Sequence, residues 1–248
     1  MSRNFDLLHD MERYHEVRPV QTVEPAMRIP VAEDTVYQRP GVVDDGSVKL
    51  VQRLLAPQAV DAPRVVVFAG IEHGNGCTHT AVSVAEALAA SGDRSVCLVE
   101  ANFRSPAKSG IFRTNNEQGL SDALSRDGLI RSYGKSSRNN KLWVISAGSL
   151  ATESPNLLTS ERLKARCEQL REEFDVVIID APPLAHYADA IALGRLADGV
   201  VVVIEAESTR RESALAAVEN LRNADVKIIG AVLNKRVYPI PEKVYSIL

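Results

Sequence analysis

The chain has 248 residues, which is enough for one large α/β domain and a short appendage. Its 29 basic and 32 acidic residues give a net charge of −3, so no strong basic field favours nucleic acid as a partner. The three cysteines lack paired spacing, which indicates a reducing compartment, and the five histidines form no zinc-ligand pattern with them.

Residues 1–45 are predicted to form an N-terminal helix and a flexible linker. Phe5, Leu8 and Met11 recur at helical spacing, and four prolines interrupt the polar stretch that follows. The first residues carry charges where a signal peptide needs an apolar core, and no apolar run approaches the roughly 20 residues that span a bilayer. We therefore expect a soluble, cytoplasmic protein, which only a partner would hold at the inner face of a membrane.

Residues 46–248 are predicted to form a single domain. After a helical pattern at 47–55, short apolar runs rich in Val and Ile alternate with amphipathic segments. The runs lie at 65–69, 96–100, 142–146, 175–180, 200–206 and 227–233, and the helical patterns at 79–91, 160–173, 188–196 and 209–223. Strands that are apolar on both faces and separated by helices predict an α/β fold: a doubly wound, mainly parallel sheet with helices on both faces. Ligands of such sheets bind at the carboxyl ends of the strands.

The loop after the first predicted strand, residues 70–79, has the features of a phosphate-binding loop. It runs directly into a helix, and Gly74 and Gly76 allow the backbone to approach an anion closely. Thr78 stands where a P-loop hydroxyl binds Mg²⁺, and Cys77 stands where the lysine is expected. A glycine-rich turn without a ligand is the alternative. The candidate nucleotide-binding residues here are Gly74, Asn75, Gly76, Cys77, Thr78 and His79.

Polar residues also end three other predicted strands. Glu100 and Asn102 follow the second strand, and Asp180 ends the fourth, where it suits the carboxylate that orders metal and water beside phosphates. Asn234 ends the last strand, where its amide can read an adenine edge. Because these strand ends meet at one edge of the sheet, together they predict a nucleotide site.

These residues resemble the bacterial tyrosine kinases (BY-kinases) of capsule and exopolysaccharide synthesis, relatives of the MinD/ParA P-loop NTPases. The similarity covers about residues 48–248 and is densest in FDVVIIDAPPLAHYADAIALGRLADGVVVVIEAESTRRESALAAVENLR, followed by IIGAVLN. In this family Asp180 matches the metal-ordering aspartate of the Walker B motif. Glu100 and Asn102 stand where relatives usually have two aspartates, so these three residues are the candidate catalytic group, with Thr78 and Asp180 as metal ligands.

The resemblance also implies ligands and partners. It implies ATP or ADP with Mg²⁺, contacted at the base by Asn234, and a membrane-bound polysaccharide chain-length regulator (co-polymerase) as partner. A homo-oligomer is a further implication, although only Arg53 fits the family's oligomerisation motif. The tyrosine-rich tail that relatives phosphorylate is reduced to Tyr238 and Tyr245, which serve as phosphoacceptors or simply as apolar anchors.

The missing lysine leaves three functions open. Without that cation, phosphate binding weakens and phosphotransfer suffers more, which favours a catalytically impaired nucleotide-binding protein that regulates export. An active tyrosine autokinase with a rearranged site and a scaffold without nucleotide are the alternatives. Cys77 starts a predicted helix, where a thiolate is stabilised, so a reactive thiol is a further hypothesis; a small residue that fills the lysine's space is the alternative.

Overall fold

The structure is a computed structural model, and it describes residues 45–55, 62–92, 94–105, 118–136, 140–149, 157–158 and 160–236. The predicted helix and linker up to residue 44, together with Tyr238 and Tyr245, lie outside the described residues. The first described element, α2 (Asp45–Leu50), continues into the π-helical turn η1 (Val51–Leu55), in agreement with the helical pattern at 47–55.

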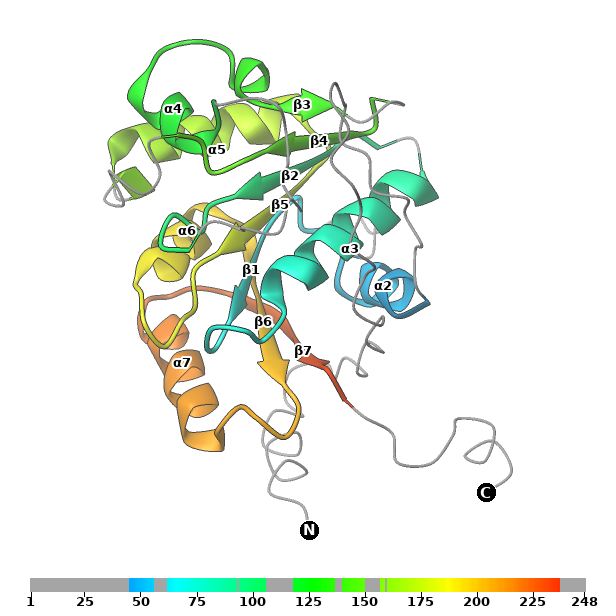
Figure 1. The fold of residues 1–248 in the computed structure, drawn as a ribbon, viewed down its shortest axis with the longest axis vertical. Helices are drawn as coiled ribbons and strands as arrows, with labels where there is room; N and C mark the ends of the chain where they lie inside the picture. Colours follow the sequence, from blue (N-terminus) through cyan, green and yellow to red (C-terminus); the bar gives the residue numbers. More distant parts are fainter. Residues whose placement is uncertain are drawn as a thin grey trace.

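A seven-stranded sheet in the order β3-β4-β2-β5-β1-β6-β7 forms the centre of the molecule (Figure 1). All neighbouring strands pair in parallel except β3, which runs antiparallel to β4 at one edge. The six predicted strands are confirmed, because each is an apolar run packed between layers of helices. The strands are β1 (Val65–Gly70), β2 (Val96–Glu100), β3 (Lys135–Ser136), β4 (Leu142–Ile145), β5 (Val176–Ala181), β6 (Gly199–Glu205) and β7 (Ile228–Asn234).

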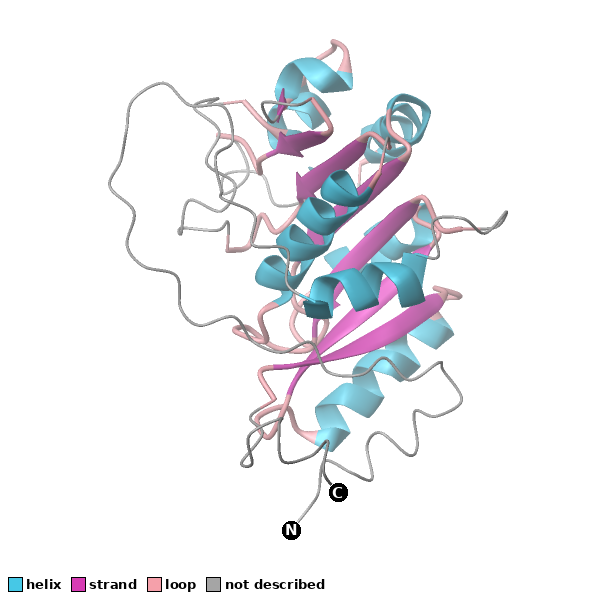
Figure 2. Ribbon diagram, turned by 90° about the vertical axis from the view of Figure 1, so that its right-hand side faces the viewer, coloured by secondary structure: helices cyan, strands magenta, loops and turns pink. Residues whose placement is uncertain are grey.

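Helices cover both faces of the sheet, as the sequence predicts for a doubly wound fold. One face packs against α2, η1 and α3 (Cys77–Ser91), with Phe68, Leu88 and Leu98 in its core. The opposite face packs against four helices around a second core. These are α4 (Leu120–Ser125), α5 (Glu161–Glu173), α6 (Asp189–Leu196) and α7 (Arg211–Asn223). Figure 2 shows α2 and α3 in front of the strands.

Three short elements were not predicted: the strand β3, the helix α4 and the 3₁₀ turn η2 (Ile130–Tyr133). They have two, six and four residues, so none is long enough to show a period in the sequence. The residues that the structure describes include no helix long and apolar enough to cross a membrane.

The register of the sheet places the candidate site. Glu100 on β2 lies beside Asp180 on β5, and Asp180 also pairs with Phe68 on β1, two residues before the phosphate loop. On the other side of β1, Glu205 of β6 pairs with Asn234 of β7. The carboxyl ends of β2, β5, β1, β6 and β7 therefore surround the loop that leads from β1 to α3.

Candidate functional site

The loop between β1 and α3 has the backbone that an anion cradle requires. Gly74 and Gly76 adopt φ angles of 85° and 83°, in the left-handed region that favours glycine. Gly76 is also the residue that precedes the first turn of α3, so the amide groups at that helix terminus face the cradle. Open space surrounds the position that a side chain on Gly74 would take, whereas on Gly76 it would collide with Asn234.

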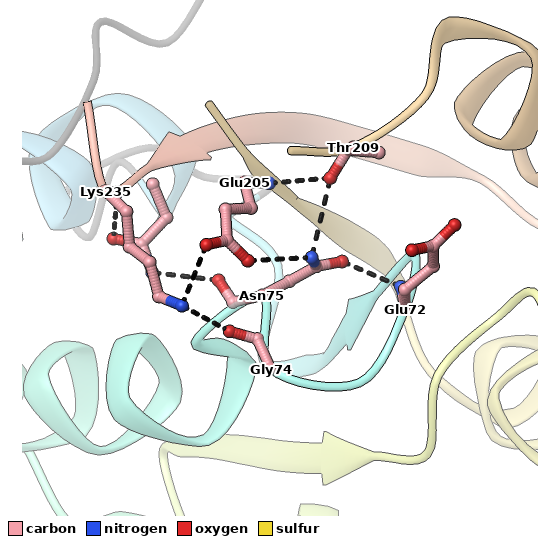
Figure 3. A network of polar contacts seen from close by, with 7 residues as sticks. Glu72, Gly74, Asn75, Glu205, Thr209 and Lys235 are labelled. Atoms are coloured by element: carbon pink, nitrogen blue, oxygen red, sulfur yellow. Dashed lines mark hydrogen bonds and ion pairs between the residues drawn. The ribbon is translucent and has the colours of Figure 1, made fainter. Parts of the chain in front are cut away.

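Asn75 is buried in the middle of this loop and ties it to two other parts of the chain (Figure 3). Its Oδ1 accepts a hydrogen bond of 2.7 Å from the backbone N–H of Glu72, which closes the loop on itself. Its Nδ2 donates to Glu205 Oε2 and Thr209 Oγ1, each at 3.4 Å. The side chain of Asn75 therefore shapes the loop from within the protein.

Asn234 also holds the loop. Its Nδ2 donates a hydrogen bond of 2.9 Å to the backbone carbonyl of Asn75, and its Oδ1 accepts one of 2.9 Å from the backbone N–H of Lys235. Both ends of the amide are thus engaged inside the protein. The structure assigns Asn234 a structural role that the sequence did not suggest, and its contact with a base stays a prediction.

Glu205, Thr209 and Lys235 were not among the predicted site residues. Lys235 Nζ donates to the backbone carbonyl of Gly74 at 2.7 Å and lies 3.0 Å from Glu205 Oε1. A cation therefore contacts the phosphate loop, although from the end of β7 and not from position 77. The sequence could have indicated these two residues, because Glu205 and Lys235 lie at the carboxyl ends of the two strands next to β1 on that side.

Asp180 faces the first turn of α3, and Thr78 Oγ1 donates a hydrogen bond of 2.7 Å to its Oδ2. The carboxylate is 1% exposed, and no described residue donates a hydrogen bond to its Oδ1. Burial raises the pKa of Asp180 to about 7; the neighbouring charge of Glu100 acts in the same direction, whereas Thr78 and Cys77 partly offset the shift. A buried carboxylate with one unused oxygen is suited to a cation.

Of the other two candidate catalytic residues, only Glu100 joins this group directly. Glu100 is buried next to Asp180, and its Oε2 accepts a hydrogen bond of 2.9 Å from the backbone N–H of Ala147. Asn102 instead accepts a hydrogen bond of 3.1 Å from the N–H of Ser105 in its own loop. The catalytic roles of both residues stay predictions.

Cys77 lies partly buried at the start of α3, beside Asp180. The hypothesis of a stabilised thiolate is wrong for this structure. Burial raises the pKa of the Cys77 thiol well above its ordinary value, and the nearby charge of Asp180 raises it further. With its pKa raised in this way, the thiol is protonated at neutral pH.

Side chains with rings gather beside the loop. The imidazole of His73 stacks on that of His186 with 5.3 Å between centroids, and both approach Tyr187 edge-on at 6.1 Å. Arg104 lies over the ring of Tyr187 and forms an ion pair of 2.9 Å with the buried Asp189. His79 is partly buried on the first turn of α3. Its contact with nucleotide stays a prediction.

The residues present fit Mg²⁺ in the predicted position. Mg²⁺ prefers oxygen ligands and is usually bound by one or two carboxylates together with substrate phosphates. Thr78 and Asp180 offer a hydroxyl and a carboxylate side by side, with Asp180 Oδ1 available for a ligand. The described part of the chain holds no group of three or more His, Cys, Asp or Glu residues that could bind a metal alone.

The chain is similar to known proteins over most of its length. An AAA-domain family model (AAA_31) matches residues 63–237. The tyrosine-protein kinase YwqD of Bacillus subtilis is 32% identical over 161 residues, which cover 65% of this chain and 68% of YwqD. The kinase domain of the Escherichia coli tyrosine kinase ETK superposes with a TM-score of 0.77 at 20% identity, covering 97% of this chain and 98% of that domain.

A more distant structural neighbour is a variant of Cyanothece McdA in complex with ATP, with a TM-score of 0.54 and 24% identity. The aligned parts cover 68% of this chain and 67% of McdA. At this level of identity the likeness concerns the fold alone. The family match and the similarity to YwqD go further, since each extends over about two thirds of the chain or more. The chain belongs to the bacterial tyrosine kinase family of P-loop AAA domains.

Proposed function

We propose that this protein binds ATP or ADP with Mg²⁺, transfers phosphate slowly or not at all, and regulates the synthesis and export of a capsular or extracellular polysaccharide. The observation that carries the proposal is that the loop between β1 and α3 keeps the backbone of an anion cradle but lacks the lysine expected at position 77. The left-handed backbone at Gly74 and Gly76 and the hydrogen bond from Thr78 to Asp180 support binding of phosphates with Mg²⁺. Cys77, in contrast, presents a neutral thiol.

The physical consequences for binding and for chemistry differ. Losing a charge-assisted hydrogen bond to phosphate costs roughly 1.5–3 kcal/mol, so binding weakens by about tenfold to a hundredfold and can survive on backbone amides and Mg²⁺. Losing a cation from the transferring phosphoryl group slows chemistry by a factor on the order of 10³–10⁵, judged from arginine fingers. Asn102 carries no charge at a position where relatives usually have an aspartate, so the acidic group near the phosphates also loses a negative charge. Nucleotide binding with impaired transfer follows from these magnitudes.

The family supplies the setting of the proposal. Tyrosine kinases of this kind act in polysaccharide export, and those without a membrane segment work through a membrane-bound chain-length regulator. We propose such a co-polymerase as the partner, residues 1–45 as the segment that docks on it, and residues 46–248 as the nucleotide-binding domain. The protein would then work at the inner face of the membrane.

Calorimetric titration with ATP and ADP, with and without Mg²⁺, tests the proposal, with the isosteric Asp180→Asn variant as the control. We expect binding that requires Mg²⁺ and is lost in the variant, together with no phosphotyrosine in the purified protein. Phosphate on Tyr238 or Tyr245 that disappears in Tyr→Phe variants would identify an active autokinase instead. If no binding is detected at millimolar nucleotide, the remaining alternative is a scaffold that acts without nucleotide.

A further inference from the structure

Glu205 and Lys235, which we call the outer clamp, contact the phosphate loop from the side opposite to its cradle. We propose that the outer clamp holds the loop in its anion-binding shape, and that Lys235 is a positioning residue that acts on bound phosphate through the loop's own peptide groups. This inference rests on the proposed nucleotide site, and it identifies the side chains that hold the loop of that site in place.

The clamp contacts two consecutive residues of the loop (Figure 3). Lys235 Nζ donates to the carbonyl of Gly74 at 2.7 Å and pairs with Glu205 Oε1 at 3.0 Å. The other oxygen of Glu205, Oε2, accepts from Asn75 Nδ2 at 3.4 Å. A single carboxylate thus bridges the lysine and the buried asparagine, and loss of either clamp residue would loosen the loop.

The backbone of Lys235 shows that its position is enforced. Its φ angle of 56° lies in the left-handed region, which residues other than glycine rarely adopt. Such a conformation persists where surrounding contacts determine it. Here the N–H of Lys235 donates to Asn234 Oδ1, and the side chain reaches back to Gly74.

The direction of the loop's peptide groups links the clamp to the ligand. In a trans peptide the carbonyl of one residue and the N–H of the next point in opposite directions. Lys235 binds the carbonyl of Gly74 and Asn234 binds that of Asn75, so the N–H groups of Asn75 and Gly76 point away from these side chains. These two N–H groups are therefore directed to the cradle side.

A cation at the carbonyl end of a peptide also polarises the N–H at the other end, since hydrogen bonds in a chain strengthen one another. Lys235 thereby supplies part of the positive potential that Cys77 cannot supply. The Lys235 side chain is 42% exposed, so this contribution is partly screened by water and falls as salt is added. It is a partial substitute for a lysine that contacts the phosphate directly.

Hydrogen–deuterium exchange of the protein without nucleotide tests the clamp independently of any ligand. We expect Lys235→Met and Glu205→Gln to increase exchange in peptides that cover residues 72–78, with little change in β2 or α7. Lys235→Arg should restore protection, because its guanidinium can reach both acceptors. Lys227→Met, at an exposed lysine just before β7, is the matched control and should leave the loop unchanged.

Titration with Mg²⁺–ATP gives the second measurement. A loop that spends less time in the competent shape lowers the apparent affinity in proportion, so we expect Lys235→Met and Glu205→Gln to weaken binding by about three- to tenfold. This loss of affinity should be smaller at high salt concentration. If the unmodified protein binds no nucleotide but the exchange differences appear, the proposed function and the action of Lys235 on bound phosphate both fail, and only the holding of the loop by the outer clamp stands. Unchanged exchange in both variants, or exchange that rises throughout the domain, overturns the clamp.

Discussion

The side-chain amide of Asn234 lies directly over Gly76, at the place where a side chain on residue 76 would begin. The same amide donates to the carbonyl of Asn75, 159 residues away in the sequence. The end of the last strand therefore fits against the loop after the first strand so closely that only glycine is accommodated at position 76.

Gly76→Ala tests this fit. The new methyl group would collide with Asn234 and would place alanine in the left-handed region, so we expect a loss of about 2–4 kcal/mol in the free energy of unfolding and no measurable nucleotide binding. Gly74→Ala is the matched control, because Gly74 has a similar φ angle with open space around it. Its loss should be about 1 kcal/mol. Equal losses in denaturant titrations would contradict the contact with Asn234.

Asp180→Asn is expected to change how stability depends on pH in metal-free buffer. The folded-state pKa of Asp180 is about 7 against an ordinary value of 3.8, so the folded protein keeps the proton after the unfolded chain has lost it. The penalty for ionising the buried carboxylate is thus absent below pH 3.8, grows as pH rises, and is complete above pH 7, at about 4 kcal/mol.

The asparagine variant avoids this penalty. Near pH 4 the variant should have the same free energy of unfolding as the unmodified protein, and at pH 8 it should be more stable by about 2–4 kcal/mol. Urea denaturation with a chelator present measures both values. Parallel curves for the two proteins across this range would show that Asp180 titrates normally.

Cys77→Lys should restore the cation that the phosphate loop lacks. We expect the affinity for Mg²⁺–ATP to increase by about tenfold to a hundredfold, because a charge-assisted hydrogen bond to phosphate contributes roughly 1.5–3 kcal/mol. Cys77→Met, which has a long but neutral side chain, is the matched control for size. Calorimetry should separate the two variants, and a gain of the same size in both would attribute the effect to volume instead of charge.

The thiol of Cys77 should react slowly with iodoacetamide at neutral pH. Its raised pKa leaves little thiolate, and Asp180→Asn removes one of the causes of that shift. Each unit by which the pKa falls raises the thiolate fraction about tenfold, so labelling of Cys77 should accelerate in the variant. A variant in which Cys97 and Cys167 are alanine isolates the signal for mass spectrometry. Rapid labelling of Cys77 with Asp180 intact would contradict the burial of the thiol.

The ion pair between Arg104 and Asp189 should be strongly coupled. Asp189 is 4% exposed, so Arg104→Ala leaves a buried carboxylate without its cation, and we expect a loss of about 1–3 kcal/mol in stability. In a double-mutant cycle with Asp189→Asn, the coupling energy should exceed about 0.5 kcal/mol. Additive losses would show that the pair contributes little.

The sequence by itself determined the sheet and the position of the loop. Runs such as 65–69 and 200–206 are apolar on both faces, and the glycines at 74 and 76 precede a helical pattern, so both features follow from local spacing. Asp180 and Glu100 could be assigned to one edge because parallel strands align their carboxyl ends, and the register confirms that they are neighbours.

Only the tertiary structure decided how the side chains at that edge are used. Lys235 reaches Gly74 across 161 residues, and its side chain turns back because of a left-handed backbone that no spacing in the sequence reveals. Asn234 holds the loop for a similar reason, since its direction depends on the pairing of β6 with β7. The raised pKa values of Asp180 and Cys77 likewise arise from burial, which depends on the packing of α3 against the sheet and not on local sequence.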